Sequence, residues 1–234
     1  MNAHISPTPT EVARELVQYI LRLVDLQADE TFTIALSGGN TPALLFDIWS
    51  TEFAEATPWS KLRFFWVDER CVPPTDAASN YGMTERHLLS RVPLREEQVF
   101  RIKGEDNPAE EAERYSSLVR EEVRVVEGMP IFDLVLLGAG DDGHTSSIFP
   151  DRSDLLTSDQ LFAVAAHPES GQQRIALTGQ PIVHARNVVF LMTGAAKAPI
   201  YRDMLQNKVT GPATFVAHHA LYDVEVFADE AVAQ

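Results

Sequence analysis

The stretch that decides the fold is FDLVLLGAGDDGH, residues 132–144. It begins with a continuous apolar run that has the length of a strand buried on both faces, and a glycine-rich turn ends that run. Two aspartates and a histidine follow directly, so polar groups stand where a buried strand stops. The pattern predicts a parallel sheet with a polar site at the carboxyl ends of its strands.

The same pattern of apolar run, polar turn and helical spacing recurs along the chain. Strands are expected at 31–36, 62–67, 132–137, 161–166, 174–178 and 188–193, with possible edge strands at 215–217 and 224–227. Helices are expected at 10–25, 43–49, 107–126 and 195–206, with one more after Tyr81. The expected fold class is therefore α/β, a three-layer αβα sandwich with a mostly parallel, Rossmann-like sheet.

Composition limits the classes of function. The chain of 234 residues shows no linker or internal repeat, so residues 1–234 are expected to form a single domain. A formal charge of −15 opposes binding to nucleic acid or to an anionic membrane. Without a membrane span or a secretion signal, the chain is expected to be cytoplasmic and monomeric, with a small molecule as its only partner.

The turn SGGNTP, residues 37–42, is a candidate seat for an anion. Its two glycines let backbone amides turn inward, and a helix whose free N–H groups face the turn begins there. Ser37, Gly38, Gly39, Asn40 and Thr41 are the residues expected to bind. An ordinary strand-to-helix turn would use the same glycines equally well, so both interpretations stay open.

Three basic residues at strand ends or helix starts could complete an anion site. Lys197 stands near the first turn of a helix, where a lysine opposes the helix dipole. Arg70 ends one apolar run and Arg174 begins another, and each could grip phosphate oxygens with two N–H groups. Taken singly, each of the three could also be an ordinary solvated surface charge.

His144 is the candidate general base. It lies where a turn is expected to run into a helix, and the nearby Asp142 could hold a neutral imidazole in one tautomer. A histidine that caps a turn or packs in the core is the alternative. No Cys, His and carboxylate set has zinc spacing, including the adjacent His218 and His219, and no metal is expected. The lone Cys71 is read as a small buried residue rather than a nucleophile.

These motifs together resemble a known family. SGGNTP, FFWVDERCVP, SNYGM, LLGAGDDGHTSSIFP, RIALT and TGAAK occur in the order, and at about the spacing, of the 6-phosphogluconolactonases, which share a superfamily with the glucosamine-6-phosphate isomerases and deaminases. The resemblance implies hydrolysis of 6-phosphogluconolactone to 6-phosphogluconate, in the pentose phosphate pathway, without a cofactor. It implies catalytic positions at His144 and Asp68. It implies positions around the substrate at Gly38, Gly39, Thr41, Arg70, Asn80, Arg174 and Lys197.

Two other functions remain open at this point. The deaminase branch typically carries a glutamate five residues after the histidine, where this chain has Phe149, and that residue counts against deamination. A sugar-phosphate sensor without activity is the second alternative, and the lack of an attached DNA-binding segment counts against it. Asn40, His184 and Val226 depart from residues frequent in the family, and these departures could alter how the substrate fits.

Overall fold

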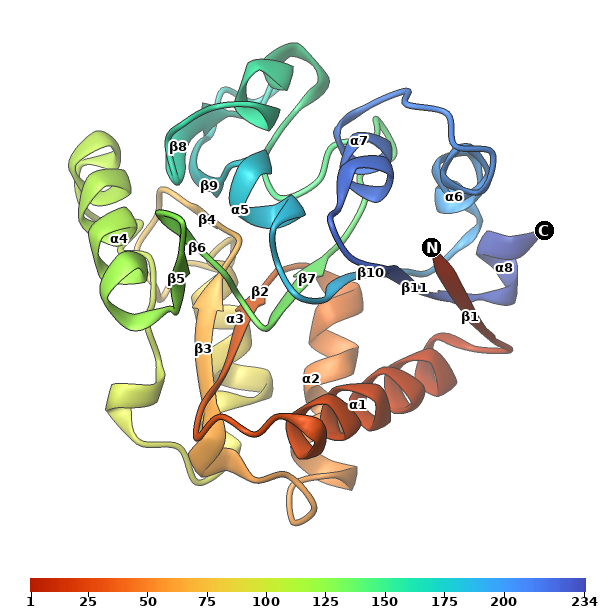
Figure 1. Ribbon diagram of the computed structural model, residues 1–234, viewed down its shortest axis with the longest axis horizontal. Coiled ribbons are helices and arrows are strands. Elements are labelled where there is room, and N and C mark those ends of the chain that lie inside the picture. The colour runs from red at the N-terminus through yellow and green to blue at the C-terminus, as the bar shows by residue number, and fades with distance from the viewer.

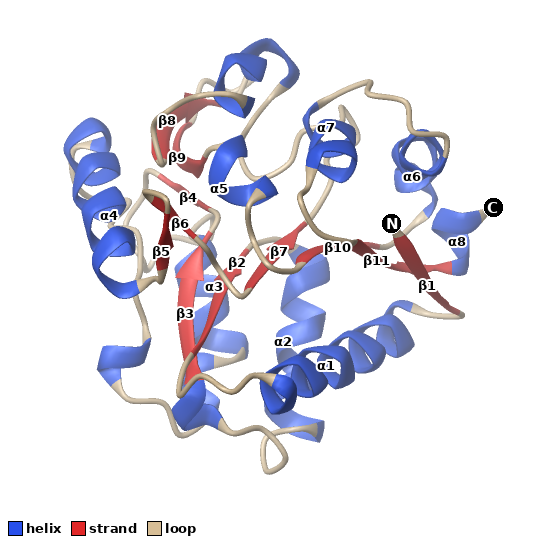
Figure 2. Cartoon of the chain, viewed as in Figure 1, coloured by secondary structure: helices blue, strands red, loops and turns tan.

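A central sheet of six parallel strands organises the chain, which is described over residues 1–234 by a computed structural model. The strand order is β1-β11-β10-β7-β2-β3, and every pairing within this sheet is parallel. The strands are β1 (Asn2–Ser6), β2 (Phe32–Leu36), β3 (Leu62–Trp66), β7 (Leu134–Leu137), β10 (Val188–Met192) and β11 (Val224–Asp229). Figure 2 shows them as one band between two groups of helices.

Helices cover both faces of this sheet, and the expected three-layer αβα sandwich is confirmed (Figure 1). One face carries α1 (Pro9–Leu26), α2 (Asn40–Glu52) and α3 (Asn80–His87), while the other carries α5 (Gly179–Val183), α6 (Ala198–Leu205) and α7 (Pro212–His219). The outer elements are α4 (Pro108–Glu122) and α8 (Glu230–Ala233). Short 3-10 helices are η1 (Trp59–Lys61), η2 (Leu89–Arg91), η3 (Glu96–Gln98), η4 (Pro150–Leu156) and η5 (Ala195–Lys197).

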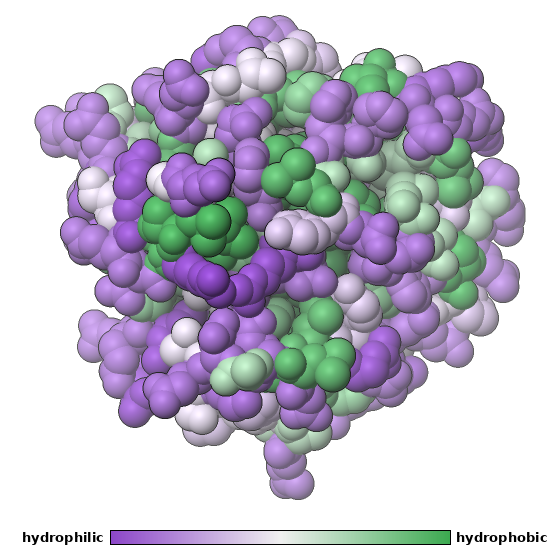
Figure 3. Space-filling model, in the orientation of Figure 1, coloured by the Kyte–Doolittle hydropathy of each residue, from purple (hydrophilic) through white to green (hydrophobic).

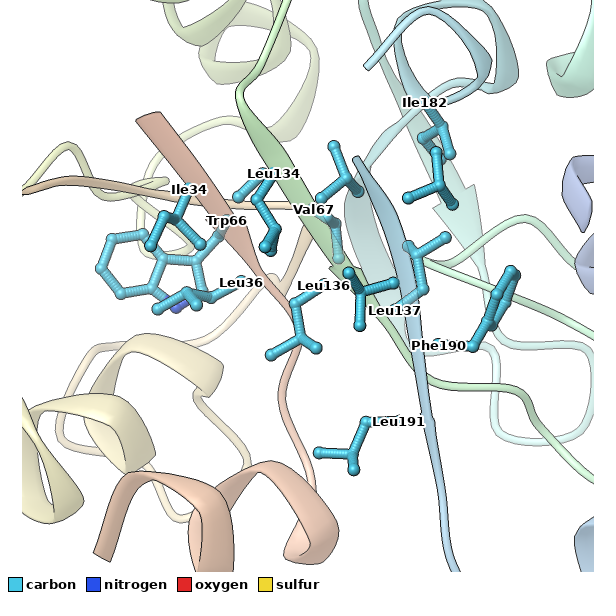
Figure 4. Close-up of a cluster of buried hydrophobic side chains, with 14 of the residues drawn as sticks. Ile34, Leu36, Trp66, Val67, Leu134, Leu136, Leu137, Ile182, Phe190 and Leu191 are labelled. Atoms are coloured by element: carbon cyan, nitrogen blue, oxygen red, sulfur yellow. The ribbon is translucent and has the colours of Figure 1, made fainter. Parts of the chain in front are cut away.

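The core lies between the sheet and its helices as one continuous cluster of 61 buried hydrophobic residues. Figure 4 shows buried side chains of β2, β7 and β10 in one cluster, with Ile182 of α5 at its upper edge. These strands are buried along their whole length, which explains why they are apolar runs rather than alternating patterns. Removing apolar surface from water at roughly 25 cal/mol per Å² is the main force that holds the sandwich together.

The order of the strands reverses between β2 and β7. From β2 the chain continues outward through β3 on one side, whereas β7, β10 and β11 extend the sheet on the other. A reversal of this kind opens a crevice between the loops at the carboxyl ends of the two strands. The turn after β2 contains Ser37, and the turn after β7 contains His144, so the topology brings these two distant segments together.

A second, antiparallel sheet of three strands stands above the carboxyl end of the central one. Its order is β4 (Asp68–Arg70), β9 (Gln173–Leu177) and β8 (Phe162–Ala166). The sequence analysis placed the last two among the strands of a mostly parallel sheet, and that assignment was wrong. The connection from β8 to β9 is too short for the crossover that parallel strands require, so it closes as a hairpin.

Three further expectations about the periphery were wrong. Residues 215–217 lie in α7, because Pro212 occupies the first turn and the Thr214 hydroxyl accepts the N–H groups of residues 210 and 211. Strand β11 is not at the edge, because β1, which the apolar pattern missed, pairs outside it. The predicted N-cap of α4, Asn107, is confirmed, but the helix ends at Glu122. A tight turn then pairs β5 (Val125–Val126) with β6 (Met129–Pro130).

The surface agrees with the strongly acidic composition. Figure 3 shows a face on which hydrophilic residues predominate and hydrophobic ones form separate small patches. None of the helices combines the length and the apolar character needed to cross a membrane.

Candidate active site

A cavity of about 240 Å³ lies at the crevice between the ends of β2 and β7. Eight of the twelve residues that the sequence singled out as site residues line it, from segments that are distant along the chain. These eight are Ser37, Gly38, Asp68, Arg70, Asn80, His144, Arg174 and Lys197. The remaining lining residues are Gly138, Ala139, Gly140 and Ser146.

The other four residues lie just outside this cavity. Gly39 and Asn40 are exposed at the start of α2, and the Thr41 hydroxyl lies 2.9 Å from that of Thr193 on the loop after β10. Gly39 has a φ of 111°, a conformation that favours glycine and that turns the chain from β2 into the helix. Asp142 lies behind the ring of His144 rather than in the cavity.

The His144 ring is held by Asp142. Its Nδ1 lies 2.6 Å from Oδ1 of Asp142, and the same oxygen accepts the His144 backbone N–H at 3.1 Å. Burial raises the pKa of the Asp142 carboxyl, but the hydrogen bonds and charge of His144 outweigh burial and keep that pKa below its ordinary value. A carboxylate only accepts hydrogen bonds, so Nδ1 carries the proton and Nε2 keeps a lone pair.

A tight turn, rather than a helix, carries the histidine, which corrects the sequence interpretation. The Gly140 N–H donates to the His144 carbonyl, Gly143 has a φ of 83°, and helical residues begin only at Pro150. A Cβ added at Gly140 would lie 2.2 Å from Nδ1 of His144 and 2.6 Å from Oδ1 of Asp142. Glycine at this position is therefore what allows the histidine and the aspartate to fold back onto the turn.

Asp68 is buried at the base of the cavity, with 4% of its surface exposed. Its Oδ2 accepts the Ser147 hydroxyl at 2.6 Å and lies 3.8 Å from a guanidinium nitrogen of Arg174. The Asn80 amide donates to Oδ1 at 3.2 Å and to the Asp68 carbonyl at 2.9 Å. The sequence analysis did not single out Ser147, although it lies within the quoted segment around His144, because its partner is 79 residues away.

Arg70 and Arg174 stand directly opposite each other in the pairing of β4 with β9. Opposite residues of an antiparallel pair project from the same face, so two positive groups are adjacent. Arg70 donates to the Ala78 carbonyl and Arg174 to the Ser147 hydroxyl, but the Nε of each is buried without a hydrogen-bond partner. Burial lowers the pKa of Arg174, and the charge of Arg70 lowers it further.

Glu69 holds the loop that brings Asn80 into the cavity. Its buried carboxyl accepts the backbone N–H groups of Arg70, Asn80 and Tyr81 and the Ser79 hydroxyl, at 2.7 to 2.9 Å. Burial raises the pKa of this carboxyl despite those four hydrogen bonds. The N-terminal groups of α3 are thus satisfied from inside the protein, a role that the sequence analysis did not assign to Glu69.

The turn after β2 supplies uncharged groups to the cavity. The Ser37 hydroxyl is buried and has no hydrogen-bond partner, so it is available to a ligand. Gly38 lies against the side chain of Asn80, and a Cβ at Gly38 would fall 1.9 Å from the Asn80 Oδ1. The close packing of these two segments therefore requires glycine at position 38.

Lys197 lines the same cavity and follows the loop after β10. Its ammonium is paired with the exposed carboxylate of Asp141. The turn that precedes it is fixed by Asp229, whose carboxylate accepts the Gly194 N–H at 3.0 Å. Lys197 therefore belongs to the site, but part of its charge is already balanced within the protein.

The candidates that the sequence analysis set aside lie away from this chemistry. Burial raises the pKa of Cys71 to about 11, which makes this thiol a poor nucleophile at neutral pH. His218 and His219 lie on α7, and no group of three or more His, Cys, Asp or Glu side chains is arranged as a metal site. Val226 is buried in β11, and the His184 Nδ1 bonds the Gln180 carbonyl at the end of α5.

Comparison with known proteins defines the class. The family model described as glucosamine-6-phosphate isomerases/6-phosphogluconolactonase matches residues 7–224, and the chain belongs to this family. The resemblance predicted from the motifs is thereby confirmed, and with it the class of enzyme.

Several relatives are described as 6-phosphogluconolactonases. A 6-phosphogluconolactonase of Treponema pallidum is 41% identical over 90% of this chain and 86% of its own length. A solved structure described as devB protein has a TM-score of 0.92 at 36% identity, covering 99% of this chain and 98% of the other. The 6-phosphogluconolactonase from Trypanosoma cruzi has a TM-score of 0.88 at 28% identity, covering 99% of this chain and 95% of the other.

Proposed function

We propose that this protein hydrolyses 6-phospho-D-glucono-1,5-lactone to 6-phospho-D-gluconate, with His144 as the general base. One observation carries the proposal. An imidazole whose Nδ1 is fixed by a carboxylate at 2.6 Å lines the same cavity as two half-buried arginines, each with a buried Nε that has no partner. The cations can hold a phosphate while the imidazole activates a water.

The phosphate is bound by groups from both sheets. Arg70 and Arg174 line the cavity and each has a buried Nε without a partner, and Ser37 adds a hydroxyl from the turn after β2. A phosphate dianion between the two guanidinium groups removes their mutual repulsion and satisfies donors that are otherwise buried without partners. Lys197 adds a positive charge from the other side.

The chemistry then needs few parts. His144 Nε2 takes a proton from a water, and the water oxygen forms a bond to C1 of the lactone. The carbonyl electrons move onto oxygen and return as the bond from C1 to the ring oxygen breaks. The imidazolium gives its proton to the departing ring oxygen, and the product carboxylic acid loses the remaining proton to solvent. Asp142 stabilises the imidazolium between these two transfers.

The site does not favour the deaminase alternative. Phe149, which stands where that branch typically carries a glutamate, is fully buried and packs its ring 4.8 Å from that of His144, centroid to centroid. A phenylalanine cannot transfer the protons that ring opening and isomerisation require. Lactone hydrolysis needs no such group, and no cofactor is required for the steps proposed.

The test is hydrolysis of freshly prepared lactone by wild type and by His144→Ala, followed as acid release in a pH-stat. We expect the variant to lose on the order of 10²–10⁴-fold in kcat, the usual contribution of a general base, with a nearly unchanged inhibition constant for inorganic phosphate. His219→Ala is the matched control, because this exposed histidine also bonds local backbone and packs on a phenylalanine.

Two results would contradict the proposal. Full activity of His144→Ala would remove the histidine from the mechanism. Release of ammonia from glucosamine 6-phosphate, without turnover of the lactone, would favour the deaminase alternative instead.

A further inference from the structure

The cavity of the candidate site continues into a second depression, which we call the outer hollow. It measures about 410 Å³ and is lined by Gly140, Asp141, Asp142, His144, His167, Pro168, Glu169 and Lys197. It shares Gly140, His144 and Lys197 with the cavity that holds the arginines. His144 therefore stands at the junction of the two. A substrate whose phosphate lies between the arginines presents its reacting end toward the outer hollow.

His167 is fixed in the outer hollow by the turn between β8 and β9. Its Nδ1 accepts the backbone N–H groups of Glu169 and Ser170, each at 3.3 Å, and its carbonyl accepts the Gly171 N–H at 2.9 Å. Because Nδ1 is an acceptor, the proton of the neutral ring is on Nε2. That N–H makes no hydrogen bond within the protein, so the neutral ring is an oriented donor on a residue that lines the hollow.

One buried aromatic ring fixes His167 relative to the rest of the site. The Phe149 ring lies 5.3 Å from that of His167 and 4.8 Å from that of His144, centroid to centroid. The Arg174 guanidinium lies 5.5 Å from the centre of the same ring. The base, the phosphate-binding arginine and His167 are thus all packed against Phe149, and none of them can shift without disturbing it.

We propose that His167 contacts the substrate during lactone hydrolysis, with its Nε2–H donating to the carbonyl oxygen of the lactone and to the oxyanion that forms there. This inference rests on the proposed function. His167 forms no covalent bond and transfers no proton; it stabilises charge on oxygen while water adds to C1. The bond strengthens as the negative charge develops, which is the condition for raising kcat.

The charged donors near the reacting end are partly engaged elsewhere. Asp141 neutralises part of the Lys197 charge, and the arginines face the phosphate. Glu169, Asp141 and Asp142 make the rest of the outer hollow acidic, so an oxyanion there needs a donor close to it. A neutral N–H also attracts the substrate's phosphate less than a cation would, so it competes less with the arginines for the phosphate.

Two substitutions separate this role from a purely structural one, because His167 also caps its own turn. Asparagine places its oxygen near the position of Nδ1 and can accept the same backbone N–H groups, as in an Asx turn, but it does not reach into the hollow. Glutamine places its amide N–H near the position of Nε2 but does not replace the cap as closely. We expect His167→Asn to lose on the order of 10²-fold in kcat, as for loss of one oxyanion donor, and His167→Gln to stay within about tenfold of wild type.

Kinetics on fresh lactone, with the inhibition constant of inorganic phosphate, complete the test. The phosphate constant should be unchanged in both variants, and His219→Ala should retain wild-type kcat. Recovery by asparagine but not by glutamine would show that His167 only caps the turn, and full kcat in both variants would also overturn the inference. Failure of the wild-type enzyme to hydrolyse the lactone would refute the proposed function instead, which keeps the two failures distinguishable.

Discussion

The two sheets contribute to the candidate site in different ways. The six-stranded parallel sheet offers the ends of its strands, where the turns after β2 and β7 present a hydroxyl and an oriented imidazole. The small antiparallel sheet offers a strand face, where the register of β4 on β9 sets Arg70 opposite Arg174. The turns at strand ends orient single functional groups, because the backbone fixes where each group points. A strand face supplies charge, because neighbouring side chains project together.

This difference leads to unequal energetic contributions. A guanidinium and a hydroxyl would each donate hydrogen bonds to a charged phosphate, but only the guanidinium adds the attraction between two opposite full charges. Phosphate affinity should therefore depend mostly on the arginines of the small sheet, and general-base catalysis on the turn after β7 of the large one.

The largest expected effect on KM tests the small sheet. Arg174→Ala should raise KM by up to on the order of 100-fold with a smaller change in kcat, because phosphate loses a buried cationic donor. It also leaves the buried Asp68 carboxylate without the cation that lies 3.8 Å away. Ser37→Ala, the corresponding loss on the large sheet, should raise KM by only about 3- to 10-fold. Equal effects of the two substitutions on steady-state kinetics would refute the division between the sheets.

A smaller effect is expected where the two regions touch. A methyl group at Gly38 would lie 1.9 Å from the Asn80 Oδ1, and Asn80 is only 2% exposed and is bonded to Asp68. Gly38→Ala should therefore cost about 1–3 kcal/mol in overpacking, measured as the free energy of unfolding in urea. In the double variant Gly38→Ala/Asn80→Ala the contacts with Oδ1 and Cγ are gone and only the Cβ of residue 80 remains, 3.0 Å from the added methyl. Gly38→Ala should therefore cost much less stability in the Asn80→Ala background than in wild type. Additive losses would show that the close approach is not the cause.

The smallest effect concerns acid stability at the large sheet's turn. The folded pKa of Asp142 lies below the value of about 3.9 expected in the unfolded chain. Its stabilising contribution is therefore complete above that value and is lost as the pH falls through the folded pKa. Wild type should exceed Asp142→Asn in Tm by a constant amount near neutral pH, and the gap should close in acid. Thermal melts from pH 7 down to about pH 3 would measure it. A difference in Tm that widens in acid would show that the folded pKa of Asp142 is raised rather than lowered.

Much of the large sheet could be predicted from the sequence because its inner strands are buried on both faces. The runs ending at Leu36, Leu137 and Met192 are apolar except for Thr33, and each is followed by a polar turn, so the strands and the site at their ends were evident together. Strand β1, with the sequence NAHIS, was missed because it is short and largely exposed at an edge. Local pattern carries little information about such a strand.

The small sheet was misplaced for a different reason. A buried strand has the same composition in a parallel or an antiparallel sheet, so the run from Phe162 to Ala166 gave no sign of its partner's direction. Ser147 and Glu69 were missed because a serine hydroxyl or a buried carboxyl acquires its role only from groups that the fold brings to it. The motif around His144 was enough to locate the site in the sequence. The hydrogen bonds that hold the site residues in place became evident only from the three-dimensional structure.

The register of β4 on β9 has a consequence for engineering. The positive charges of Arg70 and Arg174 repel each other, and this repulsion opposes folding. The pairing that favours binding of a phosphate dianion therefore lowers the stability of the fold. A laboratory selection for heat resistance alone would tend to replace one of these arginines with a neutral residue. Such a variant would fold stably but would lose activity. Thermostable variants of this protein should be screened for lactone hydrolysis as well, so that stability and activity are selected together.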